Sequence, residues 1–319
     1  VSDCSTGVFN TDANPTANTT CEQQLEGTNT ATVFGGGDDA DGSGTFSYNQ
    51  IRFSGFSLAP GNELQSLTTG GVGSGTTFDH FMSFNSSDDG MEFFGGTVNM
   101  KYVASIGADD DGLDVDTGAQ ANLQFVVVAQ RSSGDNLIEL DSSNSDFSTD
   151  ARPQTVFQVA NFTFLERSTG NSQAIRARGG AQLVLANGVI DTDTETCIRI
   201  DEQPTIDAPP IFQSIVGDCE TGNEVRGINN DDPSDADVAA LLDANSDLNF
   251  TISLTGFVNG AGEDAVTAAN PAALSSAFET TTFIGAATGD GSAFQNWTCN
   301  SATLDFGSST GACTSLPVY

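Results

Sequence analysis

The chain is poor in basic residues. Nine Lys and Arg stand against 43 Asp and Glu, for a formal net charge of -34, and Lys101 is the single lysine. Such a surface repels DNA, RNA and anionic lipid headgroups. It attracts divalent cations, because carboxylate oxygens are the ligands that calcium prefers. The charge balance therefore argues against a nucleic-acid partner and makes Ca2+ the expected cofactor.

Long apolar runs are absent as well. No stretch approaches the roughly 20 residues that a helix needs to cross a bilayer, so we expect no membrane insertion. The first residue is Val1, and no basic segment followed by an apolar one stands near it. We expect that a leader has been removed or that the chain is a fragment.

Turn-forming residues are abundant. The 35 Gly and 9 Pro, with many Ser, Thr, Asn and Asp, favour frequent turns between short strands over long helices. A hydrophobic content of 37% with 22 Phe is too high for an acidic disordered tail. The composition therefore predicts a folded all-β protein.

The six cysteines fall into three couples that are close in sequence. Six cysteines allow many pairings, and the sequence selects none of them. No C-x-x-C pair or companion histidine indicates zinc, so we interpret the couples as three disulfides. Disulfides form in oxidising compartments, which predicts a secreted protein, extracellular or at the cell surface. The couples are Cys4 with Cys21, Cys197 with Cys219, and Cys299 with Cys313.

One pattern recurs between about residues 45 and 202. Each copy has a small or polar pair followed by an apolar, a charged and an apolar residue. The interval between copies is close to one coil of a solenoid, apart from a longer step after 138. The copies are Asp89-Gly90-Met91-Glu92-Phe93, Asp111-Gly112-Leu113-Asp114-Val115, Asn136-Leu137-Ile138-Glu139-Leu140, Gln173-Ala174-Ile175-Arg176-Ala177 and Thr196-Cys197-Ile198-Arg199-Ile200.

A second apolar strand precedes each copy, as in Phe78-Asp79-His80-Phe81-Met82. Because side chains alternate along a strand, every second residue should face inward, and neighbouring coils should stack like on like. We expect a right-handed parallel β-helix. A β-sandwich is the competitor, but it gives no reason for the repeat. The predicted inward residues are Met91, Phe93, Leu113, Val115, Ile138, Leu140, Ile175, Ile198 and Ile200.

The pattern changes beyond residue 230. Ser234 with Asp237 predicts a capped short helix, and Asn270-Pro271 before Ala-Ala-Leu predicts a second. We interpret 231–319 as a small, irregular C-terminal cap that covers the last coil. The β-helix then occupies 31–230, and 1–30 forms an N-terminal disulfide fringe.

The segment 88–99, Asp-Asp-Gly-Met-Glu-Phe-Phe-Gly-Gly-Thr-Val-Asn, is the most specific of several distinctive segments. With the others, it resembles a large family of bacterial secreted or lipoprotein-like repeat proteins. The resemblance covers nearly the whole chain and implies a right-handed β-helix, mostly without an assigned activity. It also implies further coils before Val1, so we expect an open edge that could pair with another chain. The other matching segments are 62–64, 70–76, 124–128, 283–286 and 296–299.

The repeat places the outward residues in columns. Acids stack on acids and then meet arginines. Like charges on adjacent strands, about 4.8 Å apart, repel each other unless a cation or a proton is shared. The first column is Glu92, Asp114, Glu139, Arg176 and Arg199, and the second is Phe94, Asp116, Asp141, Arg178 and Asp201.

Three interpretations of these columns stay open, and in one of them the charged residues form an unpaired, solvated face. In a polysaccharide lyase or glycoside hydrolase, the carboxylates, calcium and arginines would act on an acidic glycan. In a structural charge ladder, Glu139 and Asp141 pair with Arg176 and Arg178 along the wall. If the chain is an enzyme, the catalytic candidates are Asp114, Asp116, Glu139, Asp141, Arg176 and Arg178.

The acidic turns are the candidates for metal binding. Two of them recur one coil apart, and a third holds Asp38, Asp39 and Asp41. The competing explanation is ordinary turn chemistry, because Asp before Gly suits a turn without any metal. The predicted metal ligands are Asp88, Asp89, Asp109, Asp110 and Asp111.

No motif identifies a reaction. The single histidine, His80, cannot form a zinc site alone, and Trp297 is expected to pack beside Cys299 rather than bind a sugar. We therefore expect a non-catalytic structural or adhesive protein, stabilised by calcium, that forms a homo-oligomer or filament by end-to-end stacking. The alternatives are a calcium-dependent lyase or hydrolase on acidic glycans, and glycan binding without turnover.

Overall fold

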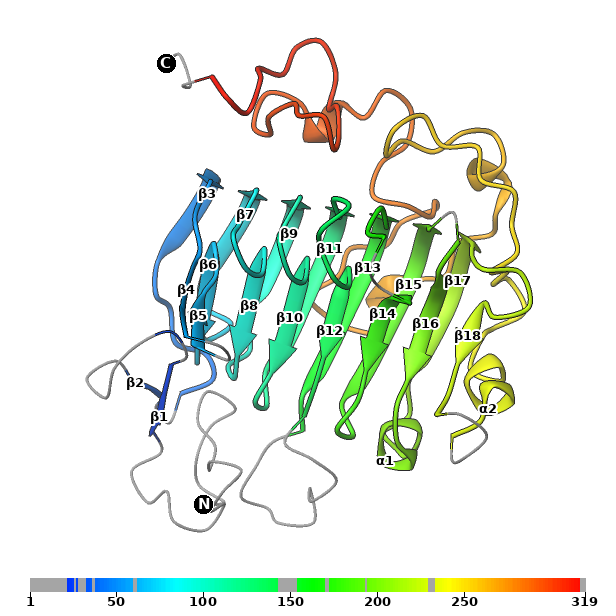
Figure 1. Ribbon diagram of the computed structural model, residues 1–319, viewed down its shortest axis with the longest axis horizontal. Coiled ribbons are helices and arrows are strands. Elements are labelled where there is room, and N and C mark those ends of the chain that lie inside the picture. The colour runs from blue at the N-terminus through cyan, green and yellow to red at the C-terminus, as the bar shows by residue number, and fades with distance from the viewer. Residues whose placement is uncertain are drawn as a thin grey trace.

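The computed structural model describes residues 22–25, 27, 33–35, 38–59, 62–142, 154–169, 172–192, 194–228 and 233–315. Successive strands wind into stacked coils along one long axis (Figure 1). Two seven-stranded parallel sheets form the walls, and neighbouring strands come from successive coils. The chain is therefore a right-handed parallel β-helix, as the repeat predicts.

The first wall contains the repeated five-residue pattern, and we call it the short-strand sheet. Its parallel pairing aligns Leu113 with Met91 on one side and with Ile138 on the other, so the predicted stacking is confirmed. The strands are β6 (Leu67–Gly70), β8 (Met91–Phe94), β10 (Leu113–Asp116), β12 (Ile138–Leu140), β14 (Gln173–Ala177), β16 (Thr196–Ile200) and β18 (Val225–Arg226).

The second wall, the long-strand sheet, contains the preceding strands of each coil. Every strand has one residue near its middle with φ between 53° and 61°, which bends the strand at a common corner. The strands are β3 (Thr45–Arg52), β7 (Thr77–Phe84), β9 (Asn99–Ile106), β11 (Gln120–Ala129), β13 (Val156–Leu165), β15 (Gln182–Asp191) and β17 (Ile211–Asp218). The corner residues are Tyr48, His80, Tyr102, Phe125, Asn161, Asn187 and Ser214.

One apolar core runs through the coils. All nine residues predicted to face inward are fully buried members of it. Along β10, for example, Leu113 and Val115 are buried while Asp114 and Asp116 are partly exposed. Alternation in the sequence thus sends the apolar side chains inward and leaves the charged ones on the outer face.

Two small antiparallel pairs lie at the N-terminal end. They are β1 (Glu22–Gln24) with β2 (Val33–Gly35), and β4 (Phe56–Ala59) with β5 (Asn62–Leu64). The predicted Cys4–Cys21 disulfide lies outside the described residues. The other two predicted disulfides, Cys197–Cys219 and Cys299–Cys313, are confirmed.

The C-terminal end of the core is closed by the chain that follows β18. Val238 and Leu248 complete the core there, and Leu242 forms a bridge with Phe212 of β17. The helix predicted at Ser234 is α2 (Asp235–Ala239), in which Ser234 and Asp237 form a capping box. A short helix, α1 (Gln203–Asp207), was not predicted.

The remaining chain, 250–315, returns along the β-helix to its first coil, and we call it the strap (Figure 1). Its helices and strands are limited to three 3-10 helices: η1 (Glu263–Ala265), η2 (Pro271–Ala273) and η3 (Ser292–Phe294). The short helix predicted at Asn270-Pro271 is η2. It covers the outer face of the long-strand sheet beyond the corner, where Phe294 and Trp297 pack with Met82. Residues 231–319 thus include more than a cover for the last coil, although the domain boundaries stay predictions.

The corner side chains fasten the strap. Asn187 Nδ2 donates to Ala269 O and its Oδ1 accepts from Ala269 N, while Asn161 Nδ2 donates to Phe283 O. At the first coil, Arg52 donates to the carbonyls of Cys313 and Ser315. No helix within the described ranges is long and apolar enough to cross a membrane.

Candidate functional site

The outer face of the short-strand sheet presents the charged columns. The pairing aligns Asp114 with Glu92 and Glu139, and then aligns Arg176 with Glu139 and Arg199. The predicted first column therefore exists in the structure. The strap covers part of the other wall, whereas these aligned charged side chains lie on the outer face of the short-strand sheet.

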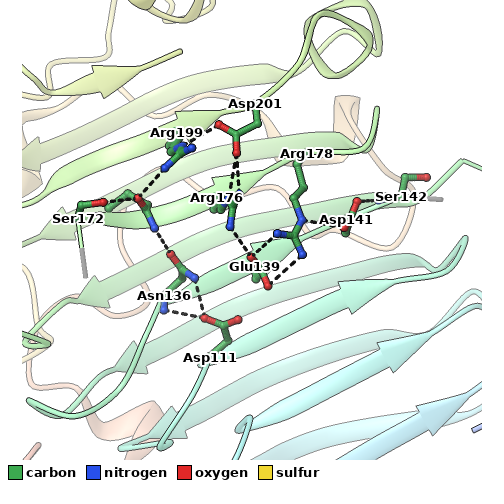
Figure 2. A network of polar contacts seen from close by, with 11 residues as sticks. Asp111, Asn136, Glu139, Asp141, Ser142, Ser172, Arg176, Arg178, Arg199 and Asp201 are labelled. Atoms are coloured by element: carbon green, nitrogen blue, oxygen red, sulfur yellow. Dashed lines mark hydrogen bonds and ion pairs between the residues drawn. The ribbon is translucent and has the colours of Figure 1, made fainter. Parts of the chain in front are cut away.

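Three arginines form a network with the acids of neighbouring coils (Figure 2). Arg176 Nη2 lies 2.9 Å from Asp201 Oδ2, and its Nη1 lies 3.4 Å from Glu139 Oε1. Arg178 contacts Asp141 at 2.7 Å and Glu139 at 3.4 Å. The pairing of Arg176 and Arg178 with Glu139 and Asp141 is the arrangement expected of a charge ladder.

Asp201 and Arg199 extend this network by one coil. Arg199 Nε donates to Asp201 Oδ1 at 2.7 Å, and the Asp201 side chain is only 5% exposed. Burial would lower the pKa of Arg178, but Glu139 and Asp141 outweigh it and hold the pKa above its ordinary value. The Arg178 guanidinium therefore stays charged beside these two carboxylates.

A cluster of acids lies beside the arginines, toward the N-terminal end of the same face. We call it the acid cluster. Its carboxylate oxygens fall into three overlapping groups, and within each group they all lie within 4.8 Å of one another. The groups are Asp89, Asp110 and Asp111; Asp89, Glu92 and Asp114; and Asp111, Asp114 and Glu139.

A row of hydrogen bonds positions the cluster. Asp111 N donates to Asp89 Oδ1 at 3.0 Å, and Asn136 donates to Asp111 Oδ1 from both its backbone N and its Nδ2 (Figure 2). Gln173 Nε2 then donates to Asn136 Oδ1 at 3.0 Å. These four residues hold the same place in successive repeats, so each coil orients the side chain of the coil before it.

The acids oppose one another's ionisation. Burial, and then the carboxylates of Asp89, Glu139 and Asp110, raise the pKa of Asp111 well above its ordinary value, although Asn136 lowers it. Burial also raises the pKa of Asp114, with Asp89 and Glu92 as the next causes. A divalent cation would relieve this repulsion, and an all-oxygen donor set suits calcium.

The structure brings three of the five predicted metal ligands together and places the other two apart from them. It brings Asp89, Asp110 and Asp111 together. Asp109 instead contacts Arg131 at 2.7 Å and accepts from Ser133, and Asp88 accepts from Gln65. Glu92, Asp114 and Glu139 complete the acid cluster, and their shared column in the repeat was the signal that could have added them to the predicted ligands.

The third acidic turn has the geometry of an ordinary turn. Asp38 Oδ1 accepts from Ala40 N at 2.9 Å, and the Asp38 carbonyl accepts from Asp41 N. In the part of the chain that the structure describes, none of the groups of acids close enough to share a cation includes Asp38, Asp39 or Asp41.

His80 and Trp297 lie elsewhere, at the long-strand corner. His80 stacks between Tyr48 and Tyr102 with ring centroids 4.4 Å apart in both pairs, and Trp297 meets it edge-on at 5.1 Å. Trp297 is buried, and Cys299 lies in the same apolar cluster. Both residues thus serve the packing of the corner against the strap.

Comparison with known proteins bears on the fold. Comparisons with curated proteins and with solved structures give no significant match. A family model described as a pectate-lyase-like β-helix domain matches residues 11–301. The match supports a parallel β-helix family, while the resemblance to bacterial lipoprotein-like proteins stays a prediction. The chain belongs to the family of pectate-lyase-like β-helix domains.

Proposed function

We propose that the chain is an extracellular, non-catalytic structural or adhesive protein whose β-helix binds calcium at the acid cluster. The observation that carries the proposal is the set of three overlapping carboxylate groups with oxygen atoms within 4.8 Å. Burial and mutual repulsion raise the pKa of Asp111 and Asp114, which is the electrostatic cost that a bound cation would offset. Each of the three groups contains Asp111 or Asp114, so any site in the cluster depends on these two carboxylates.

The arginine network supports a structural role for this face. Arg176, Arg178 and Arg199 each donate to carboxylates of the chain, so their charges are used within the wall. The two confirmed disulfides fit an extracellular location, because such bonds persist in oxidising compartments. A rigid wall that calcium holds together is suited to a surface scaffold.

Calorimetric titration of the metal-free chain with calcium tests the proposal. We expect saturable binding, and a gain in the free energy of unfolding of about 2.7 kcal/mol at a calcium concentration about 100 times Kd. The double variant Asp111→Asn with Asp114→Asn should abolish both the calcium binding and the gain in stability. Asp38→Asn removes one carboxylate from an exposed turn and should leave both unchanged. Equal binding by the wild type and the double variant would refute the proposed site.

A second function is favoured by one observation. The acid cluster and three arginines share one sheet face, an arrangement that could hold an acidic glycan through calcium. The family description is compatible with this candidate, either as binding or as cleavage. Incubation with alginate, pectin and sulfated glycans should then yield unsaturated ends or a measurable affinity. Activity that survives both Asp114→Ala and Arg176→Ala would place the reaction elsewhere.

A further inference from the structure

The N-terminal end of the β-helix is apolar on its outside. Seven large apolar side chains are exposed within the described ranges, and all of them belong to 33–64. Tyr48, at the corner of β3, is the most exposed of them at 64%. A concentration of such side chains at one place marks an interaction surface. The seven are Val33, Phe46, Tyr48, Phe53, Phe56, Leu58 and Leu64.

The same end presents a strand edge. β3 is the outermost strand of its sheet, and among the described residues it pairs with β7 alone. Beside it, a hollow of about 290 Å³ lined by Phe46, Ile51, Leu67 and Phe78 opens into the end of the core. An unpaired edge beside exposed apolar side chains is a template for another strand.

The β3 strand and the turns beside it carry few charges. No Asp or Glu occurs from 42 to 62, and Arg52 is the one charged residue there, although Asp38, Asp39, Asp41 and Glu63 flank this segment. Two copies of so acidic a protein repel each other over most of their surfaces. Contact through the β3 edge brings few acids of the two copies together.

Among the described residues, the opposite end offers no matching surface. There α2 and the chain up to 249 cover the core, with Val238 and Leu248 buried in it. A copy could not add its β3 edge to that end without displacing these residues. Head-to-tail growth is therefore disfavoured, and the partner with the same apolar side chains and the same acid-free strand edge is the β3 end of a second copy.

We propose that the β3 ends of two copies associate around a two-fold axis to form a closed dimer. The two β3 edges would pair antiparallel, which a two-fold axis requires of identical strands. The exposed Tyr48 rings would lie at the interface, at the end of the column in which Tyr48, His80, Tyr102 and Phe125 stack at 4.4 to 4.8 Å. The dimer does not depend on calcium.

Sedimentation velocity of the full chain over a wide range of concentration tests this proposal. The wild type should show a monomer and dimer equilibrium that higher salt strengthens, because salt screens the repulsion between the acidic copies. Tyr48→Asn removes the exposed ring yet keeps a residue type that the same corner uses at Asn161 and Asn187. Its dimer dissociation constant should rise by about tenfold or more.

Two further variants complete the test. Phe46→Lys places a charge on the β3 edge and should leave a monomer, whereas Ala244→Lys adds the same charge at the closed end and should leave the dimer intact. Circular dichroism confirms that each variant is folded. The proposal fails if the wild type is monomeric at every concentration, if Ala244→Lys disrupts association as much as Phe46→Lys, or if larger species grow without a dimer plateau.

Discussion

Arg178 donates from Nε to Asp141 Oδ2 at 2.7 Å, across the step between two successive coils. The ion pair links residues 37 positions apart in sequence that hold equivalent places in the repeat. Arg176 and Glu139, two residues earlier in each coil, are related in the same way. The wall is thus held by charge pairs between coils as well as by backbone hydrogen bonds.

The first prediction concerns this ladder. Replacing Arg178 with Gln leaves Glu139 and Asp141 without their shared cation, so the free energy of unfolding should fall by about 1 kcal/mol. A double-mutant cycle with Asp141→Asn in urea unfolding measures the coupling, which should weaken as salt is added because both side chains are partly exposed. A coupling energy of zero at low salt would show that the pair contributes no stability.

The acid cluster makes stability depend on both pH and calcium. The folded-state pKa of Asp114 is raised, so the fold is more stable when this carboxyl is protonated. Stability is therefore lost as pH rises through that pKa. Without calcium, Asp114→Asn should therefore stabilise the chain at neutral pH. With calcium, the order should reverse, because the variant lacks a ligand. Thermal unfolding of the wild type and the variant, with and without calcium, measures this order. The proposed site is contradicted if the same protein is the more stable one in both conditions.

Glu166 gives a second pH dependence, independent of metal. Its side chain is fully buried at the end of β13, where Oε1 accepts from Ser168 N while Oε2 has no partner among the described residues. Burial raises its pKa to about 7, against about 4.5 when unfolded. Stability should be greatest below the unfolded value and fall by about 3 kcal/mol as pH rises to about 7.

Glu166→Gln removes this titration and suits the site, because Gln130 holds the equivalent position one coil earlier. The variant should be the more stable protein at pH above 7, and the difference from wild type should shrink toward pH 4.5. Denaturant unfolding across this range measures the difference. A stability difference that does not change with pH would mean that Glu166 does not titrate in this pH range.

The strap should depend on the corner asparagines. Asn187→Gly keeps the positive φ of 57° but deletes the side chain that bonds both the carbonyl and the amide of Ala269. Loss of these bonds should cost about 1 to 3 kcal/mol. Hydrogen exchange should then rise in the strap around Ala269 while β15 stays protected. Unchanged hydrogen exchange in the strap would show that its apolar contacts alone hold it against the sheet.

The repeat in the sequence predicts the walls because it specifies them locally. Met91, Leu113 and Ile138 recur at intervals of 22 and 25 residues, and this near-constant interval predicts both the inward face and the alignment of Glu92, Asp114 and Glu139 outside. The same alignment predicts the pairing of Arg176 with Glu139. These features follow from alternation and stacking, which a sequence displays directly.

The strap could not be predicted in the same way. Its contacts join residues far apart, as when Arg52 meets Cys313, and nothing periodic in 250–315 indicates which face it covers. The corner was missed because its bend needs a positive φ, which Tyr48, His80, Tyr102 and Phe125 adopt without a glycine to signal it. The acid cluster was predicted only in part, because Asp109 forms an ion pair with Arg131 instead of joining the neighbouring acids.

The most direct measurement is a crystal structure of the chain grown in calcium, with anomalous scattering recorded to identify the ion. The account predicts one anomalous peak within one of the three carboxylate groups of the acid cluster, at about 2.3 to 2.6 Å from the carboxylate oxygens of that group. Well-ordered acid side chains without such a peak, or a calcium ion bound only at another face, would contradict it.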